Sequence, residues 1–277
     1  NSLLGGIAGD ALNTGTDNIA IGRNALTNSS TGSRSVGIGS YSLGSQQGNG
    51  SLYNTAVGYN AGNAVSTGVN NTFVGGLAGD ATTTPNNNTA VGFYSLSTNT
   101  TGAQNTALGG YALYGNTTGA HNTAIGYGTL DAETTGGQST AVGAYALTNQ
   151  QGATNNVAMG YAAGHDVSTS TQNDFVGAYS GANITSGPSN TAIGYYALQT
   201  DTLGRDTVAI GISALQTQNF TSSTYSMNVA VGNNAGQSLT NQTASVIIGA
   251  AAGSNLTADQ NVIIGSNAAQ QSTSAAQ

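Results

Sequence analysis

The chain has 277 residues, of which only 5% are charged, and its ten carboxylates and three arginines give a formal net charge of −7. This balance excludes the basic surface that binds nucleic-acid or anionic-membrane phosphates. Cysteine is absent, which excludes disulfides and thiolate metal sites. No apolar run approaches the ~18 residues of a membrane-spanning helix, and we expect no cofactor.

From its first residue the chain repeats a nine-residue motif, which is clearest at Asn190–Leu198 as Asn-Thr-Ala-Ile-Gly-Tyr-Tyr-Ala-Leu. The fifth position is glycine in sixteen copies, and twelve of the fifteen intervals between these glycines are 17 residues. A fixed period along a whole chain predicts a stacked-repeat solenoid. We therefore expect one all-β domain over residues 1–277, a parallel β-roll of sixteen coils. Neither end offers the polar cap that a stack needs, so we interpret the chain as a mature product or a fragment of a longer fibrous protein.

The first four positions of the motif are typical of a β-strand. Position four is aliphatic or Met in every copy, and position two is mostly Thr or Val. These two positions share one strand face, and position three, alanine in ten copies, lies on the other. Alanine would line the interior, so another surface must cover the aliphatic ladder, and we predict a cyclic homo-oligomer. The predicted interface ladder is Val57, Val91, Leu108, Ile125, Val142, Ile193 and Ile210.

The remaining positions predict bends and turns. The fifth-position glycine lets the backbone bend or approach a neighbouring coil closely. Position eight is always Ala, Ser or Thr, which predicts a thin coil with two closely packed sheets. Each coil is then a strand, a glycine bend, a second short strand and a Gly- or Pro-containing turn. Position one is Asn in twelve copies, which predicts a hydrogen-bonded ladder of Asn side chains.

Two insertions, Gly44–Tyr53 and Gln216–Met227, interrupt the period. Insertions in repeat proteins map to loops and often to the binding face, although drift in a tolerant loop explains them equally well. The second insertion carries Phe220 and Tyr225 among polar residues, and we expect both side chains to be exposed. The candidate receptor contacts are Phe220, Tyr225, Tyr53, Tyr111 and Tyr145.

Positions six and seven of the fourth to twelfth copies carry a row of aromatic residues. An exposed row of tyrosines could stack on sugar rings or on partner side chains. Alternatively, these rings cover the edges of the roll and the seams between subunits. The row comprises Tyr59, Phe93, Tyr94, Tyr111, Tyr127, Tyr145, Tyr161, Tyr179, Tyr195 and Tyr196.

The sequence offers little catalytic chemistry. His121 and His165, the latter beside Asp166, lie in the spacers and are expected to be solvated surface residues, because a metal or acid-base site needs several converging groups. The acidic residues form no calcium-loop pattern. With Arg23, Arg34 and Arg205 they could make ion pairs between chains, which would be weak if exposed. Gly37-Ile-Gly39 precedes no helix that could bind a phosphate. We therefore expect a protein that is not an enzyme, with no metal site.

The strand motifs Thr207–Gly211, Asn228–Gly232 and Ser245–Gly249 resemble the head repeats of YadA-like trimeric autotransporter adhesins. The form at Asn54–Tyr59 is similar to repeats of phage tail-fibre proteins that end in an endosialidase-type chaperone domain. The resemblance covers essentially the whole chain and implies a trimer of left-handed parallel β-rolls, located outside the cell on a bacterial surface or a virion tail. The spacers are longer than in the adhesin heads, and the 277 residues contain no heptad stalk, membrane-anchor or chaperone-domain pattern.

These observations favour a non-enzymatic extracellular fibre or adhesin head that attaches to a host or surface receptor, with a glycan as one candidate. An ice-binding solenoid is the first alternative, because position two forms a threonine ladder: Thr55, Thr72, Thr89, Thr106, Thr123 and Thr140. That position becomes Val or Ile toward both ends, as expected of a buried β-branched site, which weakens the alternative. The second alternative is a purely structural spacer.

Overall fold

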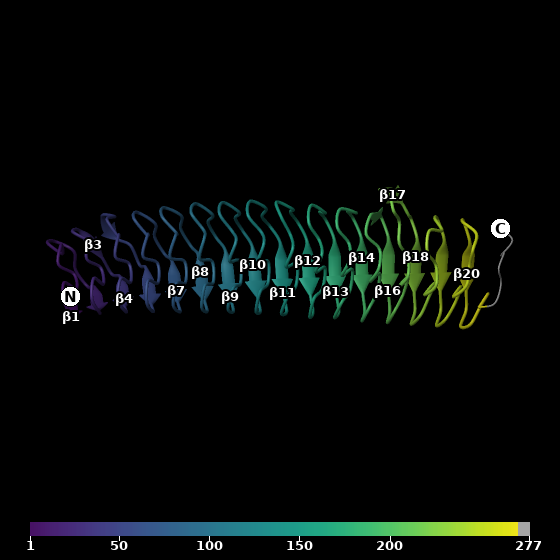
Figure 1. The fold of residues 1–277 in the computed structure, drawn as a ribbon, viewed down its shortest axis with the longest axis horizontal. Coiled ribbons are helices and arrows are strands. Elements are labelled where there is room, and N and C mark those ends of the chain that lie inside the picture. Colours follow the sequence, from purple (N-terminus) through teal and green to yellow (C-terminus); the bar gives the residue numbers. More distant parts are fainter. Residues whose placement is uncertain (271–277) are drawn as a thin grey trace. The chain divides into compact units, whose positions relative to one another are not determined.

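The computed structural model describes residues 1–270, and within that range the chain is a parallel β-solenoid without helices. No helix in this range could therefore cross a membrane. The chain divides into two compact units, Asn1–Gln138 and Ser139–Gln277. Each unit is a stack of strand-bearing coils (Figure 1), and together they hold about fifteen turns. The single domain over residues 1–277 stays a prediction, and residues 271–277 lie outside the described range.

In the first unit, one strand from each coil joins a parallel sheet. Neighbouring strands pair in the register of the repeat, so Thr106 lies beside Thr123 and Ala107 beside Ala124. The sheet comprises β1 (Ser2–Leu4), β2 (Ile19–Ile21), β4 (Val36–Ile38), β6 (Thr55–Val57), β7 (Thr72–Val74), β8 (Thr89–Val91), β9 (Thr106–Leu108) and β10 (Thr123–Ile125). The first insertion adds β5 (Gly50–Ser51), which pairs with β3 (Gly32–Ser33).

The second unit has the same construction, with Ala192 paired to Ala209 across neighbouring strands. Its sheet comprises β11 (Thr140–Val142), β12 (Val157–Met159), β13 (Asp174–Val176), β14 (Thr191–Ile193), β16 (Val208–Ile210), β18 (Val229–Val231), β19 (Val246–Ile248) and β20 (Val262–Ile264). The second insertion adds β17 (Thr224–Tyr225), which pairs with β15 (Gly204–Arg205).

The two faces of the strands are those predicted from the sequence. Position three points into the coil, and residues such as Ala107 and Ala192 are fully buried. Positions two and four point outward. Val91, Ile125 and Ile193 remain 37–39% exposed in the single chain. The remaining ladder residues, Val57, Leu108, Val142 and Ile210, are half-buried.

The second short strand predicted after the glycine bend does not form. Turn residues make the opposite wall of the coil, and positions seven and nine have left-handed backbone angles, such as φ 57° at Tyr94 and 52° at Leu96. The Tyr94 N–H donates to the preceding coil at Gly76 O (3.1 Å), and the Leu96 N–H donates to the following coil at Ala112 O (2.9 Å). This wall is therefore hydrogen-bonded from coil to coil without being a β-sheet.

Left-handed backbone is costly for residues other than glycine, by about 1–2 kcal/mol. The position-nine leucines offset that cost by burial, since Leu96 and Leu113 are both 0% exposed and a buried leucine contributes roughly 1.5–3 kcal/mol. The hydrogen bonds between coils hold the same conformation. A leucine can therefore occupy a position at which glycine would be the locally favoured residue.

The fifth-position glycine both bends the chain and approaches the next coil, as predicted. Gly109 has φ 137°, and a Cβ added to it would lie 2.4 Å from the Gly126 carbonyl oxygen. No real side chain tolerates that distance from backbone. The requirement recurs in coil after coil because adjacent coils meet at this residue in the same way.

The predicted ladder of Asn side chains is also present. Asn105 Oδ1 accepts from the Asn122 backbone N–H (2.9 Å), and Asn105 Nδ2 donates to Gly119 O (2.8 Å). Each buried amide thus joins the next coil to a turn carbonyl, which satisfies backbone groups that burial would otherwise leave unpaired.

Two carboxylates lie inside the coils, since both Glu133 and Asp201 are fully buried. Asp201 Oδ1 accepts from the N–H groups of Gly204 and Phe220, both at 3.1 Å, and Oδ2 accepts from Gln218 Nε2 at 2.7 Å. Glu133 Oε1 accepts from the Gly136 N–H at 2.6 Å. These acids stabilise turns, and Asn99 accepts the corresponding turn N–H, that of Gly102, in its own coil.

Candidate functional site

The aromatic row lies on the outer surface of both units, just after the fifth-position glycine. In the first unit, Phe93, Tyr94, Tyr111, Tyr114 and Tyr127 form a cluster of mostly edge-to-face ring contacts, with Tyr94 stacked on Tyr111 at 5.6 Å between centroids. Phe93 and Tyr127 are about half exposed. The rings therefore contact one another and still present aromatic area to solvent.

In the second unit the row continues through successive coils. Tyr161 is edge-on to Tyr145 at 5.9 Å and to Tyr179 at 5.3 Å, and Tyr179 stacks on Tyr196 at 5.3 Å. Tyr161 is 48% exposed. Desolvation and then the neighbouring Tyr161 raise the pKa of the Tyr179 phenol, and a hydrogen bond with Tyr196 raises that of Tyr195. The Tyr179 and Tyr195 hydroxyls thus stay uncharged at neutral pH.

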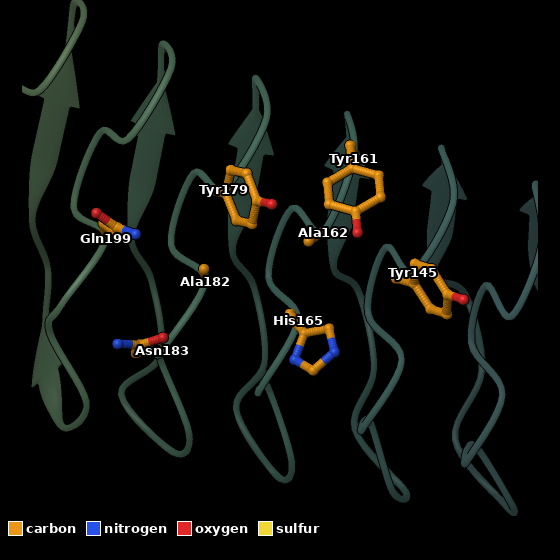
Figure 2. A pocket seen from close by; sticks show the side chains of 8 residues that line it. All are labelled: Tyr145, Tyr161, Ala162, His165, Tyr179, Ala182, Asn183 and Gln199. Atoms are coloured by element: carbon orange, nitrogen blue, oxygen red, sulfur yellow. The ribbon is translucent and has the colours of Figure 1, made fainter.

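A hollow of about 510 Å³ opens beside this row, and we name it the tyrosine groove. Two alternations of side-chain size create it. Position seven carries Tyr145, Ala162 and Tyr179 in consecutive coils, and position ten carries His165, Ala182 and Gln199. Figure 2 shows Tyr161 and Tyr179 on one side, His165 and Asn183 on the other, and the two alanines between them. The groove is lined by Tyr145, Tyr161, Ala162, His165, Tyr179, Ala182, Asn183 and Gln199.

Two polar groups of the groove, the His165 ring and the Gln199 amide, are held in place by neighbouring residues. His165 Nδ1 lies 2.7 Å from Asp166 Oδ1, which also accepts from Asn149 Nδ2 at 3.0 Å. A carboxylate only accepts, so Nδ1 carries a proton, and whenever the ring is neutral Nε2 is an acceptor. Gln199 Oε1 accepts from Gln216 Nε2 at 3.0 Å, which leaves the Gln199 amide nitrogen as its donor toward the groove.

Of the five predicted receptor contacts, only Tyr145 lines the tyrosine groove. The sequence interpretation missed His165, which it treated as a solvated surface residue, and it missed Asn183 and Gln199. The signal that could have found them is the Tyr–Ala–Tyr alternation at position seven, because an alanine between two tyrosines leaves a gap. Tyr111 lies in the first unit, within the cluster of Phe93 and Tyr127.

The expectation that Phe220 is exposed is wrong. Its side chain is only 5% exposed, because it fills the interior of the enlarged coil against Gly204, where an added Cβ would lie 2.8 Å from Phe220 Cδ2. Tyr225 and Tyr53, by contrast, are 56% and 53% exposed. Each insertion thus presents one exposed tyrosine, and the longer insertion also contains the buried Phe220 ring.

Each of the three arginines stacks on a tyrosine ring. The Arg23, Arg34 and Arg205 guanidinium carbons lie 5.0, 5.7 and 4.2 Å from the ring centroids of Tyr41, Tyr53 and Tyr225. Arg34 also lies 3.9 Å from Asp17, and Arg205 lies 3.5 Å from Asp206. These ion pairs form within the chain, and their exposure makes them weak.

Across residues 1–270 no three His, Asp or Glu side chains converge as a metal site would require. His121 is exposed and lies in the first unit, whereas His165 pairs with a single acid, Asp166, within the described range. Comparison with protein-family models, curated proteins and solved structures finds no match for the chain. The fold defines its class as a parallel β-solenoid repeat protein, and the tyrosine groove is its candidate binding site.

Proposed function

We propose that the chain is a non-enzymatic attachment head of an extracellular fibre, a surface adhesin or a phage tail fibre, that binds a receptor through the outer aromatic side of its coils. The observation that supports this function most directly is the tyrosine groove, where aromatic rings and fixed amide and imidazole groups line one hollow. Pockets that combine aromatic area with a few placed polar groups are typical of ligand sites.

The proposal includes a homotrimer of left-handed β-rolls with sixteen coils each, as the resemblance to trimeric adhesin heads implies. Its structural support is the outward ladder of position four, in which Val91, Ile125 and Ile193 form part of a recurring apolar face. Large contiguous apolar patches are unusual on monomers and mark interaction surfaces. A symmetric assembly would cover every rung of the ladder with the same residues of a second copy.

Attachment can be tested with the purified 277-residue chain on a panel of bacterial and animal cell surfaces. The double variant Tyr111→Ala/Tyr145→Ala removes one ring from each unit and should weaken attachment. His121→Ala is the matched control, because His121 is exposed and its φ of 62° resembles the 55° of Ala244 at the same repeat position. Absence of attachment to every surface would contradict the proposed function.

The ice-binding alternative keeps one specific observation in its favour. Thr55, Thr72, Thr89, Thr106 and Thr123 point outward in register along one parallel sheet and are half-buried. The burial expected of position two belongs to the proposed oligomer, in which a second copy would cover these side chains. Thermal hysteresis of the purified chain decides the question, since clear activity would favour ice and its absence would leave the receptor hypothesis.

A further inference from the structure

We infer that the tyrosine groove binds a neutral oligosaccharide chain that runs across the coils of β11 to β14. This inference rests on the proposed attachment function and specifies the chemistry of its ligand. Three tyrosine rings from consecutive coils form one side of the groove, with centroids 5.9 and 5.3 Å apart. Coils repeat every ~4.8 Å, so the groove offers a series of aromatic surfaces, which suits a ligand that is itself a short repeating chain.

The ligand must present apolar faces and hydroxyl groups together. The Tyr161 and Tyr179 rings can stack against the C–H face of a sugar ring, since tyrosine supplies rigid amphipathic area at low entropy cost. The opposite side supplies the His165 Nε2 acceptor, the Asn183 amide and the Gln199 amide nitrogen. A sugar hydroxyl both donates and accepts, so it can use all of these groups.

Charge argues for a neutral saccharide. The eight lining residues, all of them described, include no Lys or Arg, and one of them, His165, is bonded to the Asp166 carboxylate. The whole chain carries a net charge of −7. Sialylated, sulfated or phosphorylated chains would therefore meet repulsion without a compensating cation.

An extended peptide fits the same groove less well, because peptides that add to a sheet need an open edge. Here backbone N–H groups beside the groove already donate to carbonyl groups of neighbouring coils. The Ala162 N–H donates to Ala144 O (3.0 Å), Leu147 N–H to Ala163 O (3.0 Å) and Gly164 N–H to Ser180 O (2.9 Å). Recognition must then come from side chains, which are aromatic and neutral polar in this groove.

The test probes the full chain with immobilised neutral oligosaccharides of hexoses and N-acetylhexosamines, and with sialylated and sulfated forms of the same chains. We expect binding to neutral chains. Titration calorimetry with the best neutral chain should then show about tenfold weaker binding for Tyr161→Ala. Ala162→Tyr should abolish binding by filling the hollow. The backbone accepts this change, because Tyr145 and Tyr179 occupy the same position with φ 60° and 58°, against 52° at Ala162.

His121→Ala is the control, because His121 is exposed, lies in the other unit and does not belong to the aromatic row. The affinity of this variant for the neutral chain should not change. Circular dichroism confirms the fold of each variant. Binding that Ala162→Tyr leaves intact, preference for anionic chains, or a peptide ligand that Ala162→Tyr displaces would each overturn the inference. Cell attachment that survives deglycosylation of the target and Ala162→Tyr would overturn it while leaving the proposed function standing. If the unmutated chain attached to none of the cell surfaces, the proposed function itself would be refuted.

Discussion

Phe73 fills the space that a side chain on Gly79 would need, since a Cβ added to Gly79 would lie 2.3 Å from Phe73 Cε1. Gly62, one coil earlier, faces the same ring at 2.7 Å. The second unit repeats this arrangement around Phe175, with Gly164 and Gly181 at 2.7 and 2.3 Å. A phenylalanine at position three therefore requires glycine at position nine of its own and the preceding coil.

We predict that Gly79→Ala destabilises the chain by about 1–3 kcal/mol, because the added methyl group overpacks a filled interior. Phe73→Ala alone should cost about 3–5 kcal/mol through the cavity it leaves. The double variant Phe73→Ala/Gly79→Leu should recover much of that loss, because it recreates the pairing of Ala107 with Leu113, both fully buried. Denaturant unfolding of the two single variants and the double variant gives their free energies of unfolding. Strictly additive changes would contradict the compensation between positions three and nine.

The size compensation between Phe73 and Gly79 was not predicted from the sequence. The period identified the strands, their inward and outward faces, the bend glycine and the Asn ladder, because each is a property of one repeat position in a constant environment. This compensation couples positions three and nine, whereas the sequence interpretation considered each repeat position by itself. Likewise, the groove depends on Ala162 lying between tyrosines of other coils, and Phe220 is buried because the insertion enlarges its coil.

Gly109 and Gly110 are neighbours with opposite tolerance to a side chain. We expect Gly109→Ala to disrupt folding, because the Cβ would lie 2.4 Å from the Gly126 carbonyl at a φ of 137°. Gly110→Ala is the matched control, since its Cβ would make ordinary contact with the Tyr127 ring at 3.5 Å. Thermal unfolding by circular dichroism compares them, and equal melting temperatures would show that coils do not approach at position five as described.

The outward ladder predicts the effect of charge on assembly. Val142→Asp with Ile193→Asp should dissociate the proposed trimer while each chain keeps its β-structure, because both side chains point away from the coil interior. A buried unpaired carboxylate at a subunit interface is strongly unfavourable. Light scattering gives the mass, with Thr140→Ser as the control on the same face. A monomeric mass for the folded, unmutated protein would contradict the oligomer proposal.

Asp131 predicts a pH dependence in the first unit. Burial raises the pKa of this half-buried carboxyl above its ordinary value, and within the described chain its Oδ1 has no hydrogen-bond partner. The folded state therefore binds the proton more tightly than the unfolded state. The stabilising contribution of the protonated Asp131 carboxyl is complete below the pKa that Asp131 has in the unfolded chain. It is lost as the pH rises through the raised pKa of the folded state.

Asp131→Asn mimics the neutral acid and should raise the free energy of unfolding at about pH 7, by under about 1 kcal/mol after solvent screening. The gain should vanish at about pH 3, where the native carboxyl is also neutral. Thermal scans of both proteins at the two pH values measure it. Asp10→Asn, an exposed residue at the same repeat position, is the control. A gain that persists in acid would mean that the benefit comes from something other than the charge.

The second insertion separates a packing residue from an exposed one. Phe220→Ala should cost about 3 kcal/mol or more, because it empties the enlarged coil, whose turn is held by the Phe220 N–H on Asp201 at 3.1 Å. Tyr225→Ala should change stability little, since an exposed ring over Arg205 contributes only about 0.5–1 kcal/mol. Shortening the whole insertion would remove both residues and mix the two effects, so the point variants are the sharper test. If the loop contacts the receptor, Tyr225→Ala weakens attachment with unchanged unfolding. Normal attachment of Tyr225→Ala, with loss in Ala162→Tyr, would show that the insertion serves packing alone.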